Sequence, residues 1–275
     1  MKAVAVVVLN WNGWRDTIAC IHSLKKIDYP DYRIFVVDNA SSDDSVSRIE
    51  ASFPDLEVLQ SGANLGFGGG CNVGMRKALE AGLEYIWLIN SDTRVAPDAL
   101  SRMAELAEAS PCVGAVGSVI YEMDEPDRVQ LWGGGLVNRW LGQSHHRLTP
   151  GPVDFVSGAS MLLRVDAVRD VGFFDEQTFF MYWEDTDLGF RLRRAGWQLA
   201  VAEQSKVWHK QSASLGLESP LLIEYATCSA IRFLRRHAPM PYVSVALMIV
   251  LRVSKRVLRG DWMRLRAFFR GVGKA

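Results

Sequence analysis

Three carboxylates fall within four residues, at Glu184, Asp185 and Asp187, directly behind the aromatic run 179–183. Carboxylates become useful for proton transfer when their surroundings shift their pKa values, and apolar surroundings do so. The aromatic run would form one wall of a pocket beside these acids. This stretch is therefore the first candidate for a catalytic site.

A helix that begins at these acids would give them different surroundings, because residues three, four and seven apart share a face. Asp185 shares a face with Leu188, and an acid on an apolar face is costly unless it has a partner or a function. Asp187 shares a face with Arg191 and Arg194, which is typical of surface ion pairs. We therefore assign a function to Asp185 and interpret Asp187 as part of a charged surface turn.

Four more polar residues follow predicted strands in the first half of the chain. Strand and helix patterns alternate there, which predicts an α/β fold with a mostly parallel sheet flanked by helices. Ligands bind such sheets outside the carboxyl ends of the strands. Asn10, Asp38, Asn64 and Asp92 lie at or near strand ends, so their convergence on one edge favours a binding site.

The predicted strands of this half are residues 3–9, 32–37, 56–60, 85–89 and 113–120. Helices are expected at 14–26, from 41 to about 52, from a glycine-rich loop at 64–70 to 81, and from 97 onward. Less regular elements follow: a strand over 153–163 interrupted by small residues at 157–160, a strand over 197–201, a loop at 208–210 and a helix over 220–237.

The composition is that of a globular protein, with 49% hydrophobic and 23% charged residues among 275. Four scattered cysteines include no pair spaced for metal binding or redox chemistry, which favours thiols in a reducing cytosol. The first apolar run is too short for a signal peptide, and no segment reaches the about 18 apolar residues of a membrane span. We expect a cytoplasmic protein, at the inner face of the cytoplasmic membrane if it binds lipid.

The end of the chain is strongly basic. Residues 231–275 hold eleven Lys or Arg and one acid, Asp261, whereas the remaining residues hold 20 basic and 30 acidic side chains. Residues 242–251 carry no charge, and ten helical residues span only about 15 Å, half of a bilayer core. An apolar run beside so many cations favours an interfacial helix on an anionic membrane. The alternatives are a last core helix with a solvated basic end, or a nucleic-acid patch.

Six motifs occur in the order of a known family: Val7–Asn12, Val36–Asp43, Asn64–Asn72, Leu88–Thr93, Val156–Ala159 and Glu184–Leu188. In these motifs the chain resembles the inverting family 2 glycosyltransferases of the rhamnosyltransferase-like branch. The resemblance covers about residues 3–237 and implies a GT-A fold. It implies a nucleotide-sugar-binding half at 1–120 and an acceptor and catalytic half at 121–238. The amphipathic basic tail, 239–275, lies outside the match.

The resemblance gives roles to the acids. Asp185 would be the base that deprotonates an acceptor hydroxyl, and Glu184 would orient the acceptor or tune that base, since neighbouring carboxylates shift each other's pKa. The reverse assignment, with Glu184 as the base, stays open because the start of the helix is not fixed by sequence. Trp132 and Trp183 would either stack on acceptor sugars or lie in the core.

Asp92 resembles the last acid of the family's D-x-D motif, although Asn90 and Ser91 precede it here in place of a second acid. By resemblance, Asp92 and the late histidine His209 would hold Mg²⁺ or Mn²⁺ against the donor diphosphate. The histidine pair 145–146 is interpreted as exposed loop residues.

The other motif residues imply a nucleotide-sugar site. Asp38 resembles the acid that accepts a hydrogen bond from N3–H of uracil or thymine, a donor that cytosine lacks. The residues that would complete the site are Asn10, Asn64, Gly66, Gly70, Asn90 and Gly158. The glycine run lacks a following Gly-Lys-Ser/Thr, so it is not a P-loop.

One departure affects the helix after His209. Relatives often carry an Arg-Asn pair where this chain has Cys228 and Ser229. A donor or acceptor contact would therefore be missing or supplied by Arg232.

We expect inverting transfer of a sugar, L-rhamnose first, from a dTDP- or UDP-sugar to a lipid-linked or cell-envelope glycan. Nucleic acid is not an expected partner, and oligomerisation is left open. A sugar nucleotidyltransferase is the second interpretation, but the loop after the first strand lacks the basic residues that bind a triphosphate. The third is a catalytically silent, nucleotide-binding scaffold, against which the joint presence of Asp38, Asp92 and Asp185 argues.

Overall fold

The computed structural model describes residues 1–210 and 219–275. Its helices are α1 (Trp14–Leu24), α2 (Ser45–Ser52), α3 (Gly66–Glu80), α4 (Ala99–Ala109), α5 (Val165–Val171), α6 (Glu184–Arg194), α7 (Pro220–His237), α8 (Pro241–Leu258) and α9 (Trp262–Gly273). Its strands are β1 (Val4–Asn10), β2 (Tyr32–Asp38), β3 (Glu57–Gln60), β4 (Tyr85–Asn90), β5 (Thr93–Val95), β6 (Val113–Glu122), β7 (Val129–Trp132), β8 (Gly134–Asn138), β9 (Gln143–His146), β10 (Phe155–Val156), β11 (Ser160–Arg164) and β12 (Gln198–His209).

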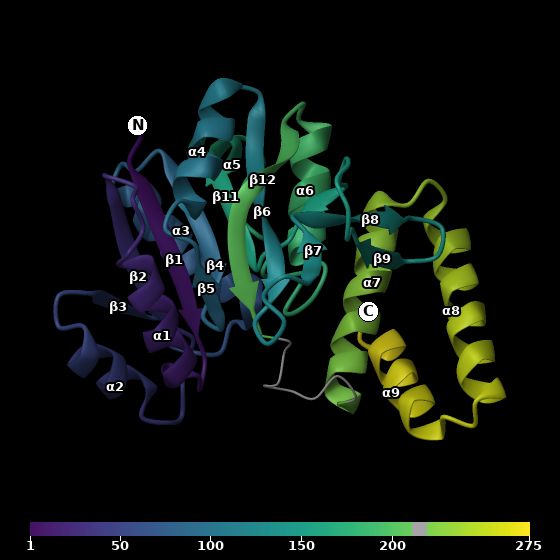
Figure 1. Ribbon diagram of the computed structural model, residues 1–275. Coiled ribbons are helices and arrows are strands. Elements are labelled where there is room, and N and C mark those ends of the chain that lie inside the picture. Colours follow the sequence, from purple (N-terminus) through teal and green to yellow (C-terminus); the bar gives the residue numbers. More distant parts are fainter. Residues whose placement is uncertain (211–218) are drawn as a thin grey trace.

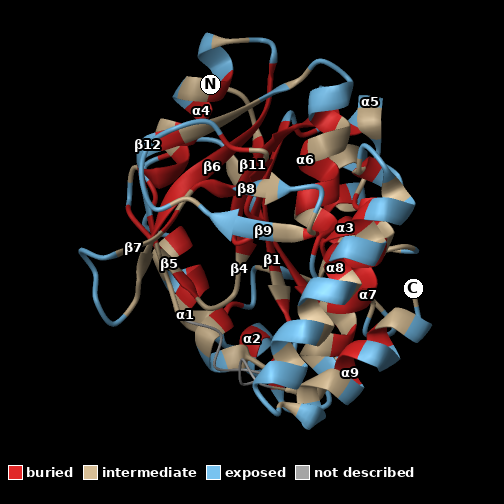
Figure 2. Cartoon of the chain, turned by 90° about the vertical axis from the view of Figure 1, so that its right-hand side faces the viewer, coloured by how far each residue is buried: buried red, intermediate tan, exposed pale blue. Residues whose placement is uncertain are grey.

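Within the described residues, a nine-stranded sheet runs through the molecule in the order β3-β2-β1-β4-β11-β6-β12-β5, with β7 beside β6. Helices cover both of its faces (Figure 1). A smaller sheet, β10-β8-β9, lies between the large sheet and the C-terminal helices. Figure 2 shows that buried residues concentrate in the large sheet, whereas α8 and α9 carry long exposed stretches.

The first four strands of the large sheet confirm the predicted parallel arrangement. β1 pairs in parallel with β2 and β4, and β2 pairs in parallel with β3. Alternate residues of β1 enter two hydrophobic cores: Val4, Val6 and Val8 on one face, Ala5 and Val7 on the other. Burial on both faces explains why this strand is an unbroken apolar run.

The second half of the sheet is mixed. β11 lies between β4 and β6 and is antiparallel to both. The single interrupted strand expected over 153–163 is therefore two strands, β10 and β11, which belong to different sheets. The break at Ser157–Ala159 separates them.

The expectation of a loop at 208–210 is wrong for Trp208 and His209, which end the long strand β12. His209 is the register partner of Thr93 on β5 and of Glu122 on β6. A register shift between Ala202 and Lys206 interrupts the ladder. This irregular, polar stretch hides the continuation of the strand in the sequence.

The glycine run expected as a loop at 64–70 is mainly the first turns of α3, which begins at Gly66. A Cβ at Gly70 would lie 2.5 Å from Leu9 Cδ1, and a Cβ at Gly66, which has φ +73°, would collide with the Phe180 carbonyl. The glycines therefore allow α3 to pack closely against β1 and against the segment before α6.

The basic tail folds back onto the body. On α9, Ala267 and Phe268 are fully buried against α7, and Gly271 approaches the backbone of Glu224. Glu224 accepts hydrogen bonds from Arg270 at 3.0 Å and from Lys274. None of the helices in the described part of the chain is both long enough and apolar enough to cross a membrane.

Candidate active site

The carboxyl ends of β1 and β2 hold a buried polar cluster. Asn10 Nδ2 donates to Asp38 Oδ1 at 2.8 Å, and Asn10 Oδ1 accepts from the Thr17 hydroxyl at 2.7 Å. The Ser41 hydroxyl donates to Asp38 Oδ1 at 2.6 Å, and the Ser41 N–H donates to Asp38 Oδ2 at 3.0 Å. Asn10 and Asp38 are at most 1% exposed, so this cluster fixes the carboxylate in one orientation. A carboxylate oxygen can accept two donors, which leaves Oδ2 capacity for a ligand.

Asn39 connects this cluster to the start of α3. Its Nδ2 donates to Asn64 Oδ1 at 3.2 Å and to the Gly66 carbonyl at 3.0 Å, and its Oδ1 accepts from the Leu65 N–H. Asn64 is exposed, whereas Gly66 is buried beneath it. Sequence reasoning missed Asn39 as a site residue, although its place directly after Asp38 is the signal that could have found it.

Asp92 and His209 lie together at the neighbouring strand ends. His209 Nε2 is 3.2 Å from Asp92 Oδ1 and 3.3 Å from Asn90 Nδ2, and its Nδ1 is 2.8 Å from Gln130 Oε1. The Asp92 side chain is 25% exposed and that of His209 12%. The contact of Nδ1 with Gln130 orients the ring so that Nε2 and the carboxylate converge, which is how a histidine metal ligand is commonly held.

This pair fits a divalent cation with an incomplete protein shell. One carboxylate and one imidazole are suitable ligands for Mn²⁺, and phosphate oxygens of a substrate would supply others. Over residues 1–210 and 219–275, no three His, Cys, Asp or Glu side chains gather in a way that could hold a metal by themselves. Asp92 and His209 therefore suit a cation that arrives with a diphosphate.

The two acids at the start of α6 have unequal surroundings. Asp185 Oδ2 accepts from the Gly158 N–H at 3.1 Å, and Oδ1 accepts from the Thr186 N–H at 2.6 Å and hydroxyl at 3.2 Å. Glu184 is 6% exposed, and within the described chain its buried Oε2 has no hydrogen-bond partner. Three donors therefore stabilise charge on Asp185, and none stabilises charge on this oxygen of Glu184.

The pKa values of the pair follow from these contacts. Burial, together with the charge of Asp185, raises the pKa of Glu184 to about 8. Burial also raises the pKa of Asp185, while the hydrogen bonds from Gly158 and Thr186 oppose the rise. The hydrogen bonds favour the charged form of Asp185 over that of Glu184, so a proton is held more readily by Glu184 and Asp185 is the better candidate for the base.

Both acids line a cavity of about 880 Å³. Tyr182 and Trp183, from the aromatic run, line it as predicted, and Trp183 also packs on Phe233 with ring centroids 4.6 Å apart. His145 and His146 are exposed, as predicted, but the expectation of a loop is wrong, because both lie on β9 and line this cavity. Trp132 lies on β7 and is not among its lining residues.

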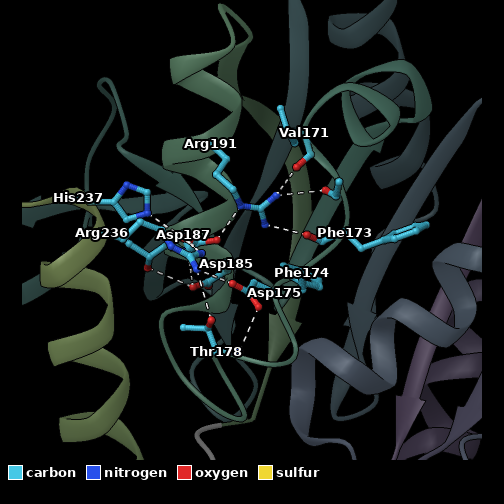
Figure 3. Close-up of polar contacts among 12 residues, drawn as sticks. Val171, Phe173, Phe174, Asp175, Thr178, Asp185, Asp187, Arg191, Arg236 and His237 are labelled. Carbon is cyan, nitrogen blue, oxygen red and sulfur yellow. Dashed lines mark hydrogen bonds and ion pairs between the residues drawn. The ribbon is translucent and has the colours of Figure 1, made fainter. Parts of the chain in front are cut away.

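The interpretation of Asp187 as a surface residue is also wrong. Asp187 is fully buried, and it accepts hydrogen bonds from Arg191 at 2.7 Å, Arg236 at 3.0 Å and His237 at 2.8 Å (Figure 3). Arg191 does pair with it as predicted, but the other two partners come from α7, which sequence periodicity within α6 cannot reveal. Burial would raise the pKa of Asp187, but the hydrogen bond from His237 and the charge of Arg191 lower it.

Ser229, at the place where relatives often carry an Arg-Asn pair, and the nearby Arg232 both make contacts within the fold. The Ser229 hydroxyl donates to the Met181 carbonyl at 2.9 Å, and Arg232 donates to the carbonyls of Thr178 and Lys274 at 2.7 and 2.8 Å. Arg232 is thus held by backbone groups and does not point to a replacement contact with a ligand.

Transfer of a sugar from a nucleotide calls for a site that binds the nucleobase, positive charge beside the leaving diphosphate and a general base for the acceptor hydroxyl. This fold offers candidates for all three, and its arrangement of strands and helices is the GT-A fold. Residues 2–219 match the family described as glycosyltransferase like family 2, and the chain belongs to that family.

Two curated relatives are similar to this chain, and the first is an L-rhamnosyltransferase. Over 209 residues the chain is 32% identical to the N-acetylglucosaminyl-diphospho-decaprenol L-rhamnosyltransferase of Mycobacterium tuberculosis, a match that covers 66% of this chain and 68% of the relative. It is 27% identical over 184 residues to the low-salt glycan biosynthesis hexosyltransferase Agl10 of Haloferax volcanii, a match that covers 64% of this chain and 58% of that relative.

Solved structures confirm the fold. The mannosyltransferase PcManGT from Pyrobaculum calidifontis, in complex with GDP-Man and Mn²⁺, superposes with a TM-score of 0.64 at 17% identity, over 97% of this chain and 73% of that one. S. aureus TarS 1–349 in complex with UDP-GlcNAc gives a TM-score of 0.61 at 15% identity, over 98% of this chain and 81% of that one.

Proposed function

We propose that this protein transfers a sugar, L-rhamnose first among the candidates, from a dTDP- or UDP-sugar to a hydroxyl of a lipid-linked or cell-envelope glycan, with inversion at the anomeric carbon. The unequal carboxylate pair, Glu184 and Asp185, at a cavity of about 880 Å³ carries this proposal. The name of the mycobacterial relative states that it transfers L-rhamnose to a lipid diphosphate that carries N-acetylglucosamine. This name supports L-rhamnose as the transferred sugar and a lipid-linked glycan as the acceptor.

In this proposal Asp185 takes the proton from the acceptor hydroxyl as that oxygen attacks the anomeric carbon. Its hydrogen bonds to Gly158 and Thr186 fix the carboxylate, so the base is held in place before the acceptor binds. Glu184, protonated at neutral pH, is a hydrogen-bond donor that positions the acceptor or Asp185. Inversion requires the base and the leaving diphosphate on opposite faces of the sugar, so in this proposal Asp185 and the diphosphate held near Asp92 lie on opposite sides of the bound sugar.

The donor would bind at the strand ends of the parallel half. Asp38 would accept from N3–H of uracil or thymine, and the exposed Asn64 would contact the nucleotide beside it. The buried residues Asn10, Gly66 and Gly70 support these two from beneath. Asn90 would contact the diphosphate beside His209.

Asp92 and His209 would hold Mn²⁺ or Mg²⁺, which supplies positive charge for the leaving diphosphate. The mixed oxygen and nitrogen ligands favour Mn²⁺ of the two. We assign residues 1–120 to donor binding, 121–238 to the acceptor and catalysis, and 239–275 to the basic tail.

Nucleotide release from a panel of dTDP- and UDP-sugars, with Mn²⁺, with Mg²⁺ and with EDTA, tests this function, because water can replace the unknown acceptor. We expect release from one donor that needs a metal and falls about a hundredfold in Asp92→Asn, since the variant weakens charge neutralisation on the diphosphate. Asp124→Asn, an exposed acid, is the matched control. Equal release in EDTA would refute the metal site. Nucleotide binding without release from any donor, even with candidate acceptors, would favour the silent scaffold.

We also propose that α8 and α9 contact an anionic membrane at its surface. Large apolar side chains are exposed on both helices, including Val250 at 61%, Leu258 at 87% and Trp262 at 59%. Such residues beside many cations are typical of an interfacial helix. Deleting the tail would be a poor test, because α9 packs against α7 and its loss would expose Phe233 and its neighbours.

Single substitutions are cleaner. Val250→Ser and Leu258→Ser should each weaken binding to phosphatidylglycerol vesicles by about tenfold, because each removes apolar area that would enter the interface without changing charge. Leu148→Ser, at a residue 58% exposed outside these helices, should leave vesicle binding unchanged. Co-sedimentation with vesicles measures the effect. Equal binding by all three variants would remove the membrane proposal.

A further inference from the structure

Helix α8 has an unusual division of its two sides. Its outward side is apolar and exposed, with Val243, Leu247 and Val250 between 41% and 61% exposed. Its inward side starts with the buried Ser244 and Met248 and continues, one and two turns later, into cations. A surface helix ordinarily points its cations outward and its apolar side inward. The reversed arrangement calls for an anion on the inward side.

The inward cations line the cavity that contains the catalytic acids. Arg252, Lys255, Arg256 and Arg259 follow one another at spacings of three, one and three residues, which places them on one side of the helix. The same cavity is lined by Asp185 of α6. The acceptor cavity is therefore bounded by the proposed base on one side and by this row of cations, the α8 row, on another.

Two cations of the α8 row, Arg252 and Arg256, make hydrogen bonds with neutral groups, although the charge of Asp261 also acts on Arg256. Arg252 donates to the Gly142 carbonyl at 2.6 Å, and Arg256 donates to the Arg252 carbonyl at 3.1 Å and lies over the Phe268 ring at 5.0 Å. Arg256 Nε is buried without a hydrogen-bond partner in the described chain. By contrast, Arg270 of α9 forms an ion pair with a carboxylate. The α8 row thus keeps positive charge available within the cavity.

The pKa of Arg252 is consistent with an excess of positive charge in the cavity. Burial, together with the charge of Arg256, lowers its pKa to about 10. Asp261 also lines the cavity, but its carboxylate forms an ion pair with Arg264 at 3.3 Å. A guanidinium in surroundings like those of Arg252 is stabilised when an anion binds beside it.

We propose that the α8 row binds the diphosphate of a glycosyl diphosphate lipid, and thereby holds the sugar hydroxyl of this acceptor against Asp185. The inference rests on the proposed function and names the acceptor by its charged group. The donor diphosphate does not compete for this place, because Asp92, His209 and Asp38 are not among the lining residues of the cavity.

The sugar, the diphosphate and the apolar chain of such an acceptor each have a matching surface on the protein. Its sugar would lie at Asp185, its diphosphate at the α8 row, and its apolar chain along the exposed outer side of the same helix. The apolar chain would then lie along the same exposed side of α8 that is proposed to contact the membrane, so the two proposals place lipid at one surface.

The test uses the full chain and the double variant Lys255→Gln/Arg259→Gln, since both side chains are exposed and their loss spares the packing of α8. Two probes are compared in detergent without vesicles: farnesyl-diphospho-N-acetylglucosamine and the uncharged farnesyl N-acetylglucosaminide. The variant should bind the diphosphate probe about tenfold more weakly or worse, because charge-assisted hydrogen bonds are lost, and should bind the uncharged probe as the wild type does. Inorganic pyrophosphate should displace the diphosphate probe from the wild type.

The matched control is Arg194→Gln/Arg266→Gln, which removes two exposed cations that do not line the cavity. Equal affinity of the wild type and the Lys255/Arg259 variant for the diphosphate probe would overturn the inference. So would a loss confined to phosphatidylglycerol vesicles without acceptor, which would assign the α8 row to lipid headgroups. Because binding is measured without a donor, intact discrimination together with no sugar transfer from any donor would reject the proposed function alone.

Discussion

Asp185→Asn should lower sugar transfer by about 10²–10⁴-fold, the range expected when a general base is lost. The substitution keeps the shape of the side chain but removes its negative charge. The new amide would also present its NH₂ group to one of the two N–H donors, of Gly158 or Thr186, that now bind the carboxylate. Donor release and transfer should therefore be measured with donor binding and urea unfolding of the same variant, so that loss of chemistry is separated from loss of structure.

Glu184→Gln is the comparison that decides which acid is the base. Glutamine resembles the protonated form that we assign to Glu184, so transfer should stay within about tenfold of wild type near neutral pH. Asp166→Asn, an exposed acid on α5, controls for the loss of a carboxylate. Full activity of Asp185→Asn together with an inactive Glu184→Gln would reverse the assignment.

Asp187→Ala should destabilise the protein by about 3–5 kcal/mol, the cost of removing one partner from a buried ion pair. Arg191, Arg236 and His237 all donate to this carboxylate, so the variant leaves their charge or donors without the acceptor that now satisfies them. These hydrogen bonds connect α6 with α7. Arg236 also donates to Asp175, so the network includes the segment before α6 (Figure 3). Urea unfolding at pH 7 measures the loss.

The pH dependence of that loss has a definite sign. The pKa of Asp187 is lower in the folded protein than its ordinary value of 3.8, because the hydrogen bond from His237 and the charge of Arg191 outweigh burial. Its contribution is thus complete above the ordinary value and disappears as the pH falls through the folded value. The difference in the free energy of unfolding between the wild type and Asp187→Ala should therefore shrink below about pH 4.

Asp98→Ala, at an exposed i,i+4 pair with Arg102, is the control and should cost at most about 1 kcal/mol. A cost for Asp187→Ala equal to that of Asp98→Ala would show that the network in Figure 3 contributes little to stability.

Local patterns predicted the parallel half of the fold because β1, β2 and β4 are largely buried apolar runs and because β1, β2 and β3 are each followed by a helix. The strand Val4–Asn10 can be predicted from its own apolar sequence, without any knowledge of the strands beside it. β12 was predicted only to Val201, since polar residues and a register shift interrupt its second half. The antiparallel place of β11 depends on contacts with β4 and β6, which no local pattern carries.

In the candidate site, too, some features could be predicted from local sequence and others depend on tertiary contacts. Asn10, Asp38 and Asp92 lie in the motifs and His209 was assigned by its resemblance to the family's late histidine, and the structure brings Asn10 to Asp38 and Asp92 to His209. The roles of Asp187 and of the α8 row depend on helices that meet only in three dimensions. A carboxylate that periodicity places on a surface becomes buried when α7 covers it.

The position of β11 has a consequence for synthesis on the ribosome. β4 and β6, which emerge first, do not pair with each other, and the strand that joins them begins only at Ser160. Until then, the nascent chain carries two apolar strands with unpaired edges, the kind of surface that chaperones protect. The joining of β4 to β6 within the sheet must therefore wait for β11, whatever the speed at which the first half acquires its structure.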